Sequence, residues 1–423
     1  MIDTNLLRSN PKDVQKAAKD KNVEINVDHI LEIDKKYKDL SISVQKLREE
    51  RNVLTDSMKG KPTPEQIEKG KALKEKLEKE ENYLKAVWDE LKEYLYKIPN
   101  IAKDDVKVGE DESKNEIVRK YKEPTKFDFK PKDHLEIGEA LDIIDVKSAA
   151  KVSGSRFGYL KNQGALLEIA LVQLALEVLT KEGFIPIIPP VLINKEITQG
   201  LGYWEGKGST DYYSVSDQEE KKEMYLIGTA EHSIVPIHKD EVLKLKDLPK
   251  RYVGFSSAFR REAGTYGKDT RGILRVHQFD KVEMVSFTTE ENSDKEHDYL
   301  LSLEEKLFQL LEIPYQVVKM CTGDLGFPIA RKFDLEAWMP GQNKYREVTS
   351  ASTATDFQSR RLNIKYSTNQ NEKKFVHILN GTAFAIGRTI ISILENYQTE
   401  DGSVLIPKVL QKYLNSEKIS SKK

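Results

Sequence analysis

The sequence predicts an α+β protein in which an antiparallel helical hairpin precedes a mostly antiparallel sheet flanked by helices. Two Lys/Glu-rich segments within residues 28–98 carry apolar residues at alternating three- and four-residue spacings. After residue 131, short strand-like runs are separated by short loops, and few of them fit a strand–helix–strand crossover. The first pattern is typical of two packed helices and the second of an antiparallel sheet.

The helical hairpin comes first along the chain. Apolar residues line up on both sides of a Gly/Pro-rich break at residues 60–64: Ile30, Ile33, Tyr37, Leu40, Val44, Leu47, Leu54 and Met58, then Leu73, Leu77, Leu84, Val87, Leu91, Tyr94 and Ile98. Each helix of such a coiled coil would extend roughly 45 Å. Periodicity alone favours a dimerisation or spacer coil. Acidic and basic residues balance over residues 27–98, so the hairpin carries no obvious basic patch.

Composition changes divide the rest of the chain. We predict an N-terminal helical domain at residues 1–103, a polar linker at 104–131, a globular domain at 132–415 and a disordered tail at 416–423. Within the globular domain we expect helices at 165–182, 297–311 and 382–397, and an extended segment at 184–190. Strands are expected at 225–227, 252–259, 278–287, 314–320 and 332–338.

Composition also excludes several classes of protein. The formal net charge of −1 argues against a protein that coats nucleic acid non-specifically. The single cysteine, Cys321, rules out an internal disulfide. The N-terminus lacks a secretory pattern, polar residues interrupt the apolar run at 165–179, and no P-loop or dinucleotide-binding motif occurs. We therefore expect a soluble, cytoplasmic protein without a membrane span.

The segment at residues 259–283 is the strongest functional signal. Between Lys250 and Lys281 there are eight Lys/Arg against three Asp/Glu, a local excess in a nearly neutral chain. Two strand-like runs flank a glycine-containing basic loop, which predicts a strand–loop–strand hairpin. Its arginines can grip phosphate oxygens and its aromatic residue can stack on a base. The hairpin is therefore a candidate binding site for a polyanion.

Three patches, taken in order, resemble the signature motifs of class II aminoacyl-tRNA synthetases. They are residues 184–190 with the preceding helix (motif 1), the hairpin at 259–283 (motif 2) and residues 380–388 (motif 3). Further segments resemble the seryl-tRNA synthetase family: TAE at 229–231, RREAG at 260–264, RVHQF at 275–279, EVTS at 347–350 and DFQSRR at 356–361. With the N-terminal hairpin, which resembles that family's tRNA-binding arm, the resemblance covers nearly the whole chain.

The resemblance implies the residues of an active site. For ATP they are Arg260, Arg261, Glu262, Val276, Phe279, Glu347, Val348, Thr349, Ser350 and Arg388. For serine they are Thr229, Ala230, Glu231, Arg260, Glu283, Asn380 and Thr382. Arg260 and Arg388 would be catalytic, and Glu347 and Ser350 would hold Mg²⁺, which prefers hard oxygen ligands.

The chemistry of these residue types suits the implied roles. A permanently charged guanidinium at Arg260 can hold both the α-phosphate and the attacking carboxylate, and Arg388 would reach the γ-phosphate. Glu262 would contact the adenine amino group and Phe279 would stack on the adenine ring. Outside such motifs, a lone Arg is usually a surface ion pair and a lone strand Phe is usually core.

A second set of residues would recognise serine. Glu231 and Glu283 can accept from an ammonium and a hydroxyl, and a pocket built for a hydroxyl rejects analogues that lack one. Thr382 also fits the N-cap of a helix. Gly381 and Gly387 fit a helix that approaches a ligand closely.

The resemblance implies a homodimer, with motif 1 near Pro190 at its interface, that forms seryl-adenylate from serine and ATP with Mg²⁺. It would then transfer serine to the 3′-terminal adenosine of tRNA(Ser). The loop at 264–272, with Lys268 and Arg271, is expected near the tRNA acceptor end, and charging of the selenocysteine tRNA, tRNA(Sec), stays open.

Two alternatives remain. An aminoacyl ligase that loads a carrier protein would lack the arm. A non-catalytic paralogue acting as an RNA-binding scaffold would not need Arg260 and Arg388.

Overall fold

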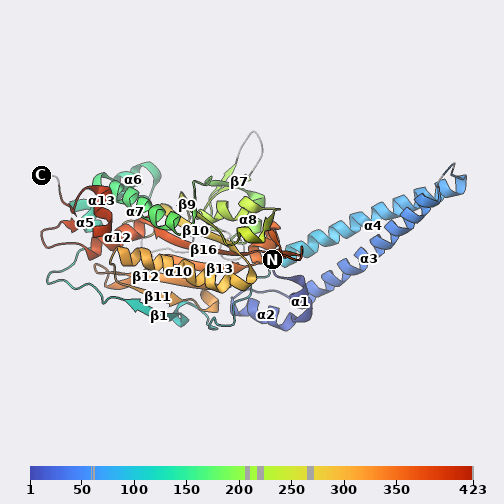
Figure 1. The fold of residues 1–423 in the computed structure, drawn as a ribbon, viewed down its shortest axis with the longest axis horizontal. Helices are drawn as coiled ribbons and strands as arrows, with labels where there is room; N and C mark the ends of the chain where they lie inside the picture. The colour runs from blue at the N-terminus through green and yellow to red at the C-terminus, as the bar shows by residue number, and fades with distance from the viewer. Residues whose placement is uncertain (59, 61, 205–209, 217–222, 264–270, 422–423) are drawn as a thin grey trace. The chain divides into compact units, whose positions relative to one another are not determined.

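The computed structural model describes residues 1–58, 60, 62–204, 210–216, 223–263 and 271–421 (Figure 1). The chain divides into two compact units, Met1–Pro99 and Asn100–Lys423. The boundary lies close to the predicted end of the helical domain at residue 103.

The first unit is helical, as the apolar spacing predicts. It contains α1 (Thr4–Ser9), α2 (Pro11–Asp20), α3 (Val27–Ser57) and α4 (Pro64–Tyr96). Tyr37 packs on Trp88 with ring centroids 5.1 Å apart, and Arg48 pairs with Glu81 at 2.8 Å. Partner numbers fall along α4 as they rise along α3, so the two long helices run antiparallel. The predicted helical hairpin is confirmed.

Local signals in the sequence set the start of each long helix. The side chain of Asn26 accepts the His29 backbone N–H at 3.1 Å at the start of α3. At the start of α4, Thr63 and Gln66 form a reciprocal capping box, which satisfies two backbone donors that the helix leaves free. Between the helices, Val44, Leu47 and Leu77 form a buried apolar seam.

The second unit is built on an eight-stranded sheet. In spatial order its strands are β1 (Glu116–Tyr121), β11 (Tyr315–Lys319), β12 (Arg331–Met339), β13 (Lys344–Thr355), β16 (His377–Ala385), β10 (Gln278–Thr288), β9 (Lys250–Phe259) and β4 (Ile185–Ile187). Every neighbouring pair is antiparallel except β4 and β9. The predicted fold class is confirmed.

Smaller elements complete this unit. Short strands form four minor sheets: β5 (Leu192–Asn194), β7 (Glu223–Leu226) and β6 (Ser214–Ser216); β15 (Lys373–Phe375), β14 (Lys365–Ser367) and β8 (Val242–Lys244); β17 (Val404–Leu405) and β18 (Lys418–Ile419); β2 (Ile144–Asp145) and β3 (Tyr159–Leu160). The helices are α5 (His134–Ala140), α6 (Val146–Ser153), α7 (Asn162–Lys181), α8 (Lys195–Leu201), α9 (Glu231–Ile234), α10 (Ser293–Leu310), α11 (Phe357–Leu362), α12 (Ile386–Asn396) and α13 (Lys408–Leu414).

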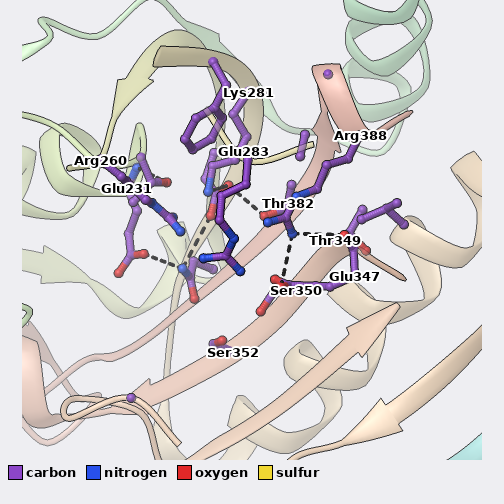
Figure 2. Close-up of a pocket in the computed structure, with 18 of the residues that line it drawn as sticks. Glu231, Arg260, Lys281, Glu283, Glu347, Thr349, Ser350, Ser352, Thr382 and Arg388 are labelled. Carbon is purple, nitrogen blue, oxygen red and sulfur yellow. Dashed lines mark hydrogen bonds and ion pairs between the residues drawn. The ribbon is translucent and has the colours of Figure 1, made fainter. Parts of the chain in front are cut away.

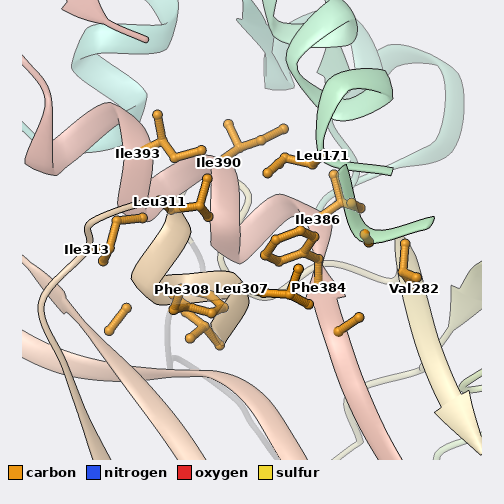
Figure 3. Packing of buried hydrophobic residues seen from close by; sticks show 14 of the residues in the cluster. Leu171, Val282, Leu307, Phe308, Leu311, Ile313, Phe384, Ile386, Ile390 and Ile393 are labelled. Atoms are coloured by element: carbon orange, nitrogen blue, oxygen red, sulfur yellow. The ribbon is translucent and has the colours of Figure 1, made fainter. Parts of the chain in front are cut away.

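The main core lies between one face of the large sheet and the helices α7, α10 and α12 (Figure 3). Leu307 and Phe308 of α10 meet Phe384 at the end of β16 and Ile390 of α12, all fully buried. Side chains alternate between the faces of a strand, so Val282 of β10 points into this core while its neighbours point to the opposite face. That opposite face carries the cavity described below.

Helix α7 belongs to this core. Its 20 residues are long and apolar enough to cross a membrane by length and composition alone. Leu167, Leu171, Leu174 and Leu179 are nevertheless buried among the residues of the main core. The helix expected at 165–182 is therefore present, as a helix of the main core.

Three predictions about the chain's organisation are wrong. The expected linker at 104–131 contributes β1, the edge strand of the large sheet, paired with β11. The expected disordered tail contributes β18, which pairs with β17 and buries Ile419 completely. The helix expected from Thr382 begins only at Ile386, because residues up to Ala385 form β16. Thr382 therefore lies within β16 and does not cap a helix.

Candidate active site

A cavity of about 290 Å³ opens on the face of the large sheet that the main core leaves uncovered (Figure 2). Most of the predicted site residues line it: Thr229, Glu231, Arg260, Glu262, Val276, Phe279, Glu283, Glu347, Val348, Thr349, Ser350, Asn380, Thr382 and Arg388. Residues separated by more than 150 positions thus meet around one space. The three motif segments are brought together as expected.

Two predicted residues stand apart from the cavity. Ala230 is fully buried in a second apolar cluster beside the site. Arg261 has an exposed side chain, and its backbone N–H donates to the Asp211 carbonyl at 2.8 Å. Neither is among the residues that line the cavity. Gly264 and Lys268, which the sequence places in the loop near the tRNA, lie outside the described residues.

Strand alternation places a buried ion pair in the cavity. Lys281 and Glu283 are two positions apart on β10 and therefore share a face of the sheet. The Lys281 ammonium lies 2.6 Å from the Glu283 carboxylate, and both side chains are buried. Across the strand pair, the Thr382 hydroxyl donates to Glu283 at 3.1 Å. Glu283 is therefore held by a cation and a hydroxyl.

Glu231, the first residue of α9, is the second buried carboxylate of the cavity. The Tyr203 hydroxyl donates to it at 2.9 Å, the Gln358 amide donates at 3.1 Å, and the Asn380 amide donates as well. Donors from three elements far apart in sequence fix its orientation. Buried carboxylates require such partners, because an unsatisfied one is costly.

Electrostatics make this end of the cavity sensitive to pH. Burial, reinforced by the neighbouring Glu283, raises the pKa of Glu231 to about 7. Burial and the nearby Arg260 hold the pKa of His232 well below its usual range. A neutral His232 agrees with its hydrogen bond, in which the Gly228 N–H donates to Nδ1 at 3.2 Å.

Arg260 lies close to His232 and Glu231 and faces an aromatic ring (Figure 2). Arg260 donates through Nε to the Gly228 carbonyl at 3.2 Å, and its guanidinium lies 5.5 Å from the Phe279 ring centroid. Among the described residues it forms no salt bridge. Beside it, Arg275 and Glu262 pair at 2.6 Å. Arg260 therefore keeps donors available for an incoming anion.

A β-bulge explains how Glu347 and Ser350 come to face the same cavity. Residues three apart on a regular strand point to opposite faces, but the register of β12 against β13 shifts here and leaves Val348 as the extra residue. The Glu347 carboxylate pairs with Arg388 at 3.1 Å. Burial alone would raise its pKa, but Arg388 and Lys332 lower it to about 2, so the group stays ionised.

The glycines of motif 3 serve different purposes. A side chain at Gly381 would come within 3.0 Å of the Glu304 carboxylate on α10, so this glycine allows a helix to pack on β16. The expectation that Gly381 lets a helix approach a ligand closely is wrong, because Gly381 lies on β16 and faces α10. Gly387, at the start of α12, does line the cavity.

Sequence reasoning missed several residues of the cavity. Lys281 could have been found by continuing the strand alternation of Phe279 and Glu283. Tyr203, Tyr212, His232 and Lys332 carry no local signal, because loops and distant strands bring them to the site. The described residues include no group of three or more His, Cys, Asp or Glu side chains that could hold a metal ion.

The sheet and its cavity are those of a class II aminoacyl-tRNA synthetase. Residues 213–397 match the family described as tRNA synthetase class II core domain (G, H, P, S and T). Residues 1–102 match the family described as seryl-tRNA synthetase N-terminal domain.

Full-length relatives narrow the class to one family. The chain is 45% identical to a serine–tRNA ligase of Dictyoglomus thermophilum, and the match covers 100% of both chains. It is similar to the crystal structure of seryl-tRNA synthetase from Pyrococcus horikoshii complexed with ATP, with a TM-score of 0.91, 40% identity and full coverage of both chains.

A second solved structure is that of the cytoplasmic serine–tRNA ligase of Naegleria fowleri in complex with AMP. The TM-score is 0.87 at 32% identity, with 100% of this chain and 99% of that one covered. The chain belongs to the seryl-tRNA synthetase family.

Proposed function

We propose that this chain activates L-serine with ATP to form seryl-adenylate and transfers serine to the 3′-terminal adenosine of tRNA(Ser). The observation that carries the proposal is the set of side chains around a single cavity. Buried carboxylates with fixed donors line it together with Arg388 and with Arg260, which lies beside Phe279. Such a cavity can bind a small zwitterion next to a nucleotide. The names of the full-length relatives give the same activity for those proteins.

The serine end would recognise an ammonium and a hydroxyl. Ionised Glu231 suits the ammonium group, because Tyr203 and Asn380 already fix its oxygens. Glu283 and Thr382 supply an acceptor and a hydroxyl for the serine side chain. A substrate without the hydroxyl would leave these buried groups unpaired, which is the physical basis of rejection.

The nucleotide end would hold ATP for an in-line attack. The serine carboxylate oxygen forms a bond to the α-phosphorus, and the bond to the leaving pyrophosphate breaks. Arg260 would hold the α-phosphate and the attacking carboxylate, Arg388 the γ-phosphate, and Phe279 the adenine ring. Glu262 would contact the adenine amino group. The chain's contribution is positioning and charge neutralisation.

Mg²⁺ fits the residues on this side of the cavity. Glu347 is ionised and Ser350 lies on the same face, so the two side chains supply hard oxygen ligands. They would hold the ion together with phosphate oxygens and water. When bound, the ion would neutralise phosphate charge.

The helical hairpin would bind the tRNA by its shape and backbone, as proteins commonly bind RNA helices. Deleting residues 41–87 removes most of α3 and α4 and leaves the Tyr37 and Trp88 ends of the hairpin. We expect this variant to form seryl-adenylate normally and to lose charging of a tRNA(Ser) transcript. Charging that survives the deletion would overturn the role of the arm. Whether tRNA(Sec) is also a substrate is tested with a second transcript.

We also propose a homodimer located in the cytoplasm. Ile188, next to the motif 1 prolines, is 88% exposed, and Leu166 and Ile169 of the adjacent α7 are half-exposed. Large apolar side chains with this exposure are common at interfaces. An Ile188→Asp variant should elute as a monomer in size-exclusion chromatography with light scattering. A wild-type monomer would contradict the proposal.

The alternatives are tested by aminoacylation with labelled serine. A non-catalytic paralogue would show no charging, and a carrier-protein ligase would form the adenylate without charging tRNA. The proposed enzyme gives charged tRNA that depends on ATP.

A further inference from the structure

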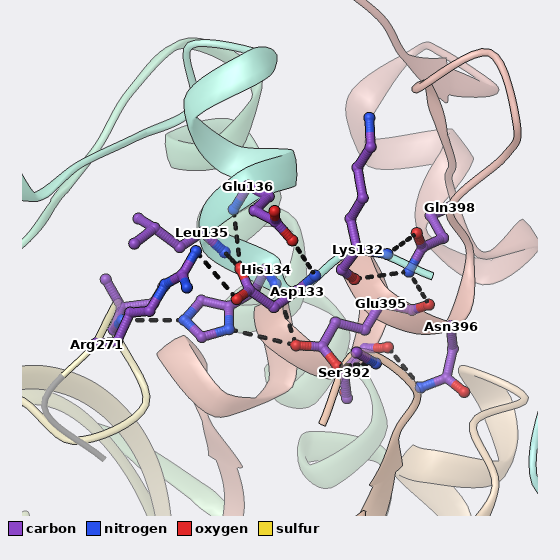
Figure 4. A network of polar contacts seen from close by, with 12 residues as sticks. Lys132, Asp133, His134, Leu135, Glu136, Arg271, Ser392, Glu395, Asn396 and Gln398 are labelled. Carbon is purple, nitrogen blue, oxygen red and sulfur yellow. Dashed lines mark hydrogen bonds and ion pairs between the residues drawn. The ribbon is translucent and has the colours of Figure 1, made fainter. Parts of the chain in front are cut away.

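A buried histidine outside the predicted ligand contacts holds part of the cavity wall. His134 is the first residue of α5 and is 4% exposed. Its Nδ1 lies 3.3 Å from a carboxylate oxygen of Glu395, which is fully buried in the last turn of α12 (Figure 4). On the other side of the ring, the Ile273 backbone N–H donates to Nε2 at 3.2 Å.

These two contacts determine the protonation of the imidazole. A backbone N–H can only donate, so Nε2 must accept and carries no proton. The proton of the neutral ring then sits on Nδ1 and is donated to Glu395. The carboxylate of Glu395 is itself oriented, since it also accepts the His134 and Gly341 backbone N–H groups at 3.1 and 2.9 Å. His134 is thus fixed as a hydrogen-bond acceptor.

The backbone that His134 holds belongs to the cavity. Ile273 and Leu274 both line it. The Leu274 carbonyl accepts from Nε of Arg388 at 3.4 Å. Helix α12 therefore fixes two peptide groups of this segment, the one that follows Leu274 directly through Arg388 in its first turn and the one that precedes Ile273 through Glu395 and His134. Arg388 and Glu395 are seven residues apart, or about two helical turns, and so lie on one side of α12.

The preceding residue fits this arrangement. Gly272 has φ +72°, and a Cβ there would lie 2.0 Å from Nε2 of His134. Only glycine lets the backbone pass this close to the imidazole. Beyond Leu274 the chain reaches Arg275, whose pair with Glu262 lies at the proposed nucleotide end.

We propose that His134, oriented by Glu395, is a positioning residue for ATP. It fixes the position of residues 273–276, which line the nucleotide end, and it does not itself line the cavity. The inference rests on the proposed function, because it takes that end of the cavity to bind the nucleotide. The proposed serine-binding residues on β10, β16 and α9 are held by hydrogen bonds that do not involve His134. A change at His134 should therefore alter the binding of ATP and leave the binding of serine unchanged.

Two substitutions distinguish the acceptor role from simple packing. In His134→Gln the side-chain carbonyl can take the place of Nε2 and accept the Ile273 N–H, whereas the shorter side chain of His134→Asn reaches Glu395 alone. In serine-dependent exchange of pyrophosphate into ATP, we expect His134→Asn to raise the KM for ATP about five- to tenfold, the loss of one buried hydrogen bond. The KM for serine of His134→Asn should stay within about twofold of the wild-type value. The KM for ATP of His134→Gln should be close to that of the wild type.

Controls separate this result from general destabilisation. His238 is also buried and bonded on both sides, to Glu241 at 2.7 Å and Tyr252 at 2.9 Å, but it does not line the cavity. We expect His238→Gln to lower the melting temperature without raising the KM for ATP. If the His134 variants fail to fold, Gly272→Ala displaces the same backbone with His134 intact and should raise the KM for ATP.

The outcomes are distinct. Equal KM values for ATP in the wild type and in His134→Asn, or a parallel rise for both substrates, would overturn the inference. A wild-type protein without serine-dependent exchange would instead overturn the proposed function.

Discussion

Replacing Glu231 by Gln should stabilise the protein at high pH while it weakens serine activation. The carboxylate is buried, and its pKa is raised to about 7 from its ordinary value of 4.5. Between these two pH values the folded state holds a proton that the unfolded state has lost. A group of this kind stabilises the fold at low pH, and that stability disappears as the pH rises through the folded pKa. Glutamine carries no titratable proton and removes the dependence.

The magnitude follows from the two pKa values. Each pH unit between them changes the free energy of unfolding by about 1.4 kcal/mol. Relative to low pH, the titration of Glu231 lowers the free energy of unfolding of the wild type by about 1.4 kcal/mol at about pH 5.5. At about pH 8 it lowers that free energy by about 3.4 kcal/mol. The difference in stability between Glu231→Gln and the wild type should therefore shift in favour of the variant by about 2 kcal/mol from pH 5.5 to pH 8.

Urea unfolding followed by tryptophan fluorescence measures this shift. The three tryptophans are Trp88 in the helical unit and Trp204 and Trp338 in the larger unit. A Trp88→Phe background therefore restricts the signal to the unit that contains Glu231. If the difference in unfolding free energy between the variant and the wild type stays constant with pH, Glu231 does not take up a proton on burial and the prediction is wrong.

The same variant has a kinetic consequence. Loss of a charged partner for the serine ammonium should raise the KM for serine about 100-fold, as expected for a hydrogen bond to a charged group. In the wild type, the KM for serine should rise as the pH falls below about 7, where Glu231 takes up its proton. A KM that is flat between pH 6 and pH 8 would argue that another group binds the ammonium.

Three further predictions concern other parts of the larger unit. Arg388→Ala should slow serine activation by about 10²- to 10³-fold, whereas Arg119→Ala, at an exposed pair on the edge strand, should not change it. Burial keeps the pKa of Glu304 well above its usual range, so Glu304→Gln should be nearly as stable as the wild type, while Glu304→Ala should lose about 2–4 kcal/mol in urea unfolding. Removing residues 416–423 should cost about 2 kcal/mol by the same measurement, because Ile419 is buried; an unchanged stability would favour a disordered tail.

Long regular patterns allowed the fold to be predicted. The apolar spacing of α3 and α4 persists over many turns, and the strands β9 and β10 have apolar runs bounded by clear breaks. The helix expected from Thr382 failed for a physical reason. The run up to Ile386 is buried on both sides of the sheet, and a continuously apolar strand cannot be distinguished by periodicity from the start of a buried helix.

Non-local contacts explain the remaining differences. β1 joins the sheet only because β11, nearly 200 residues later, offers an edge, and β18 forms only against β17. The same holds in the cavity. Motif residues such as Arg260 and Arg388 could be named from the sequence, but Tyr203 reaches Glu231 through the fold alone.

The most direct test of the central claim is amino-acid-dependent exchange of labelled pyrophosphate into ATP by the purified wild-type protein. Serine, threonine, alanine, glycine and cysteine are compared at equal concentrations. We expect strong exchange with serine and very weak exchange with alanine, which lacks the hydroxyl that Glu283 and Thr382 are placed to bind. Exchange with alanine as fast as with serine, or none with serine, would contradict the central claim.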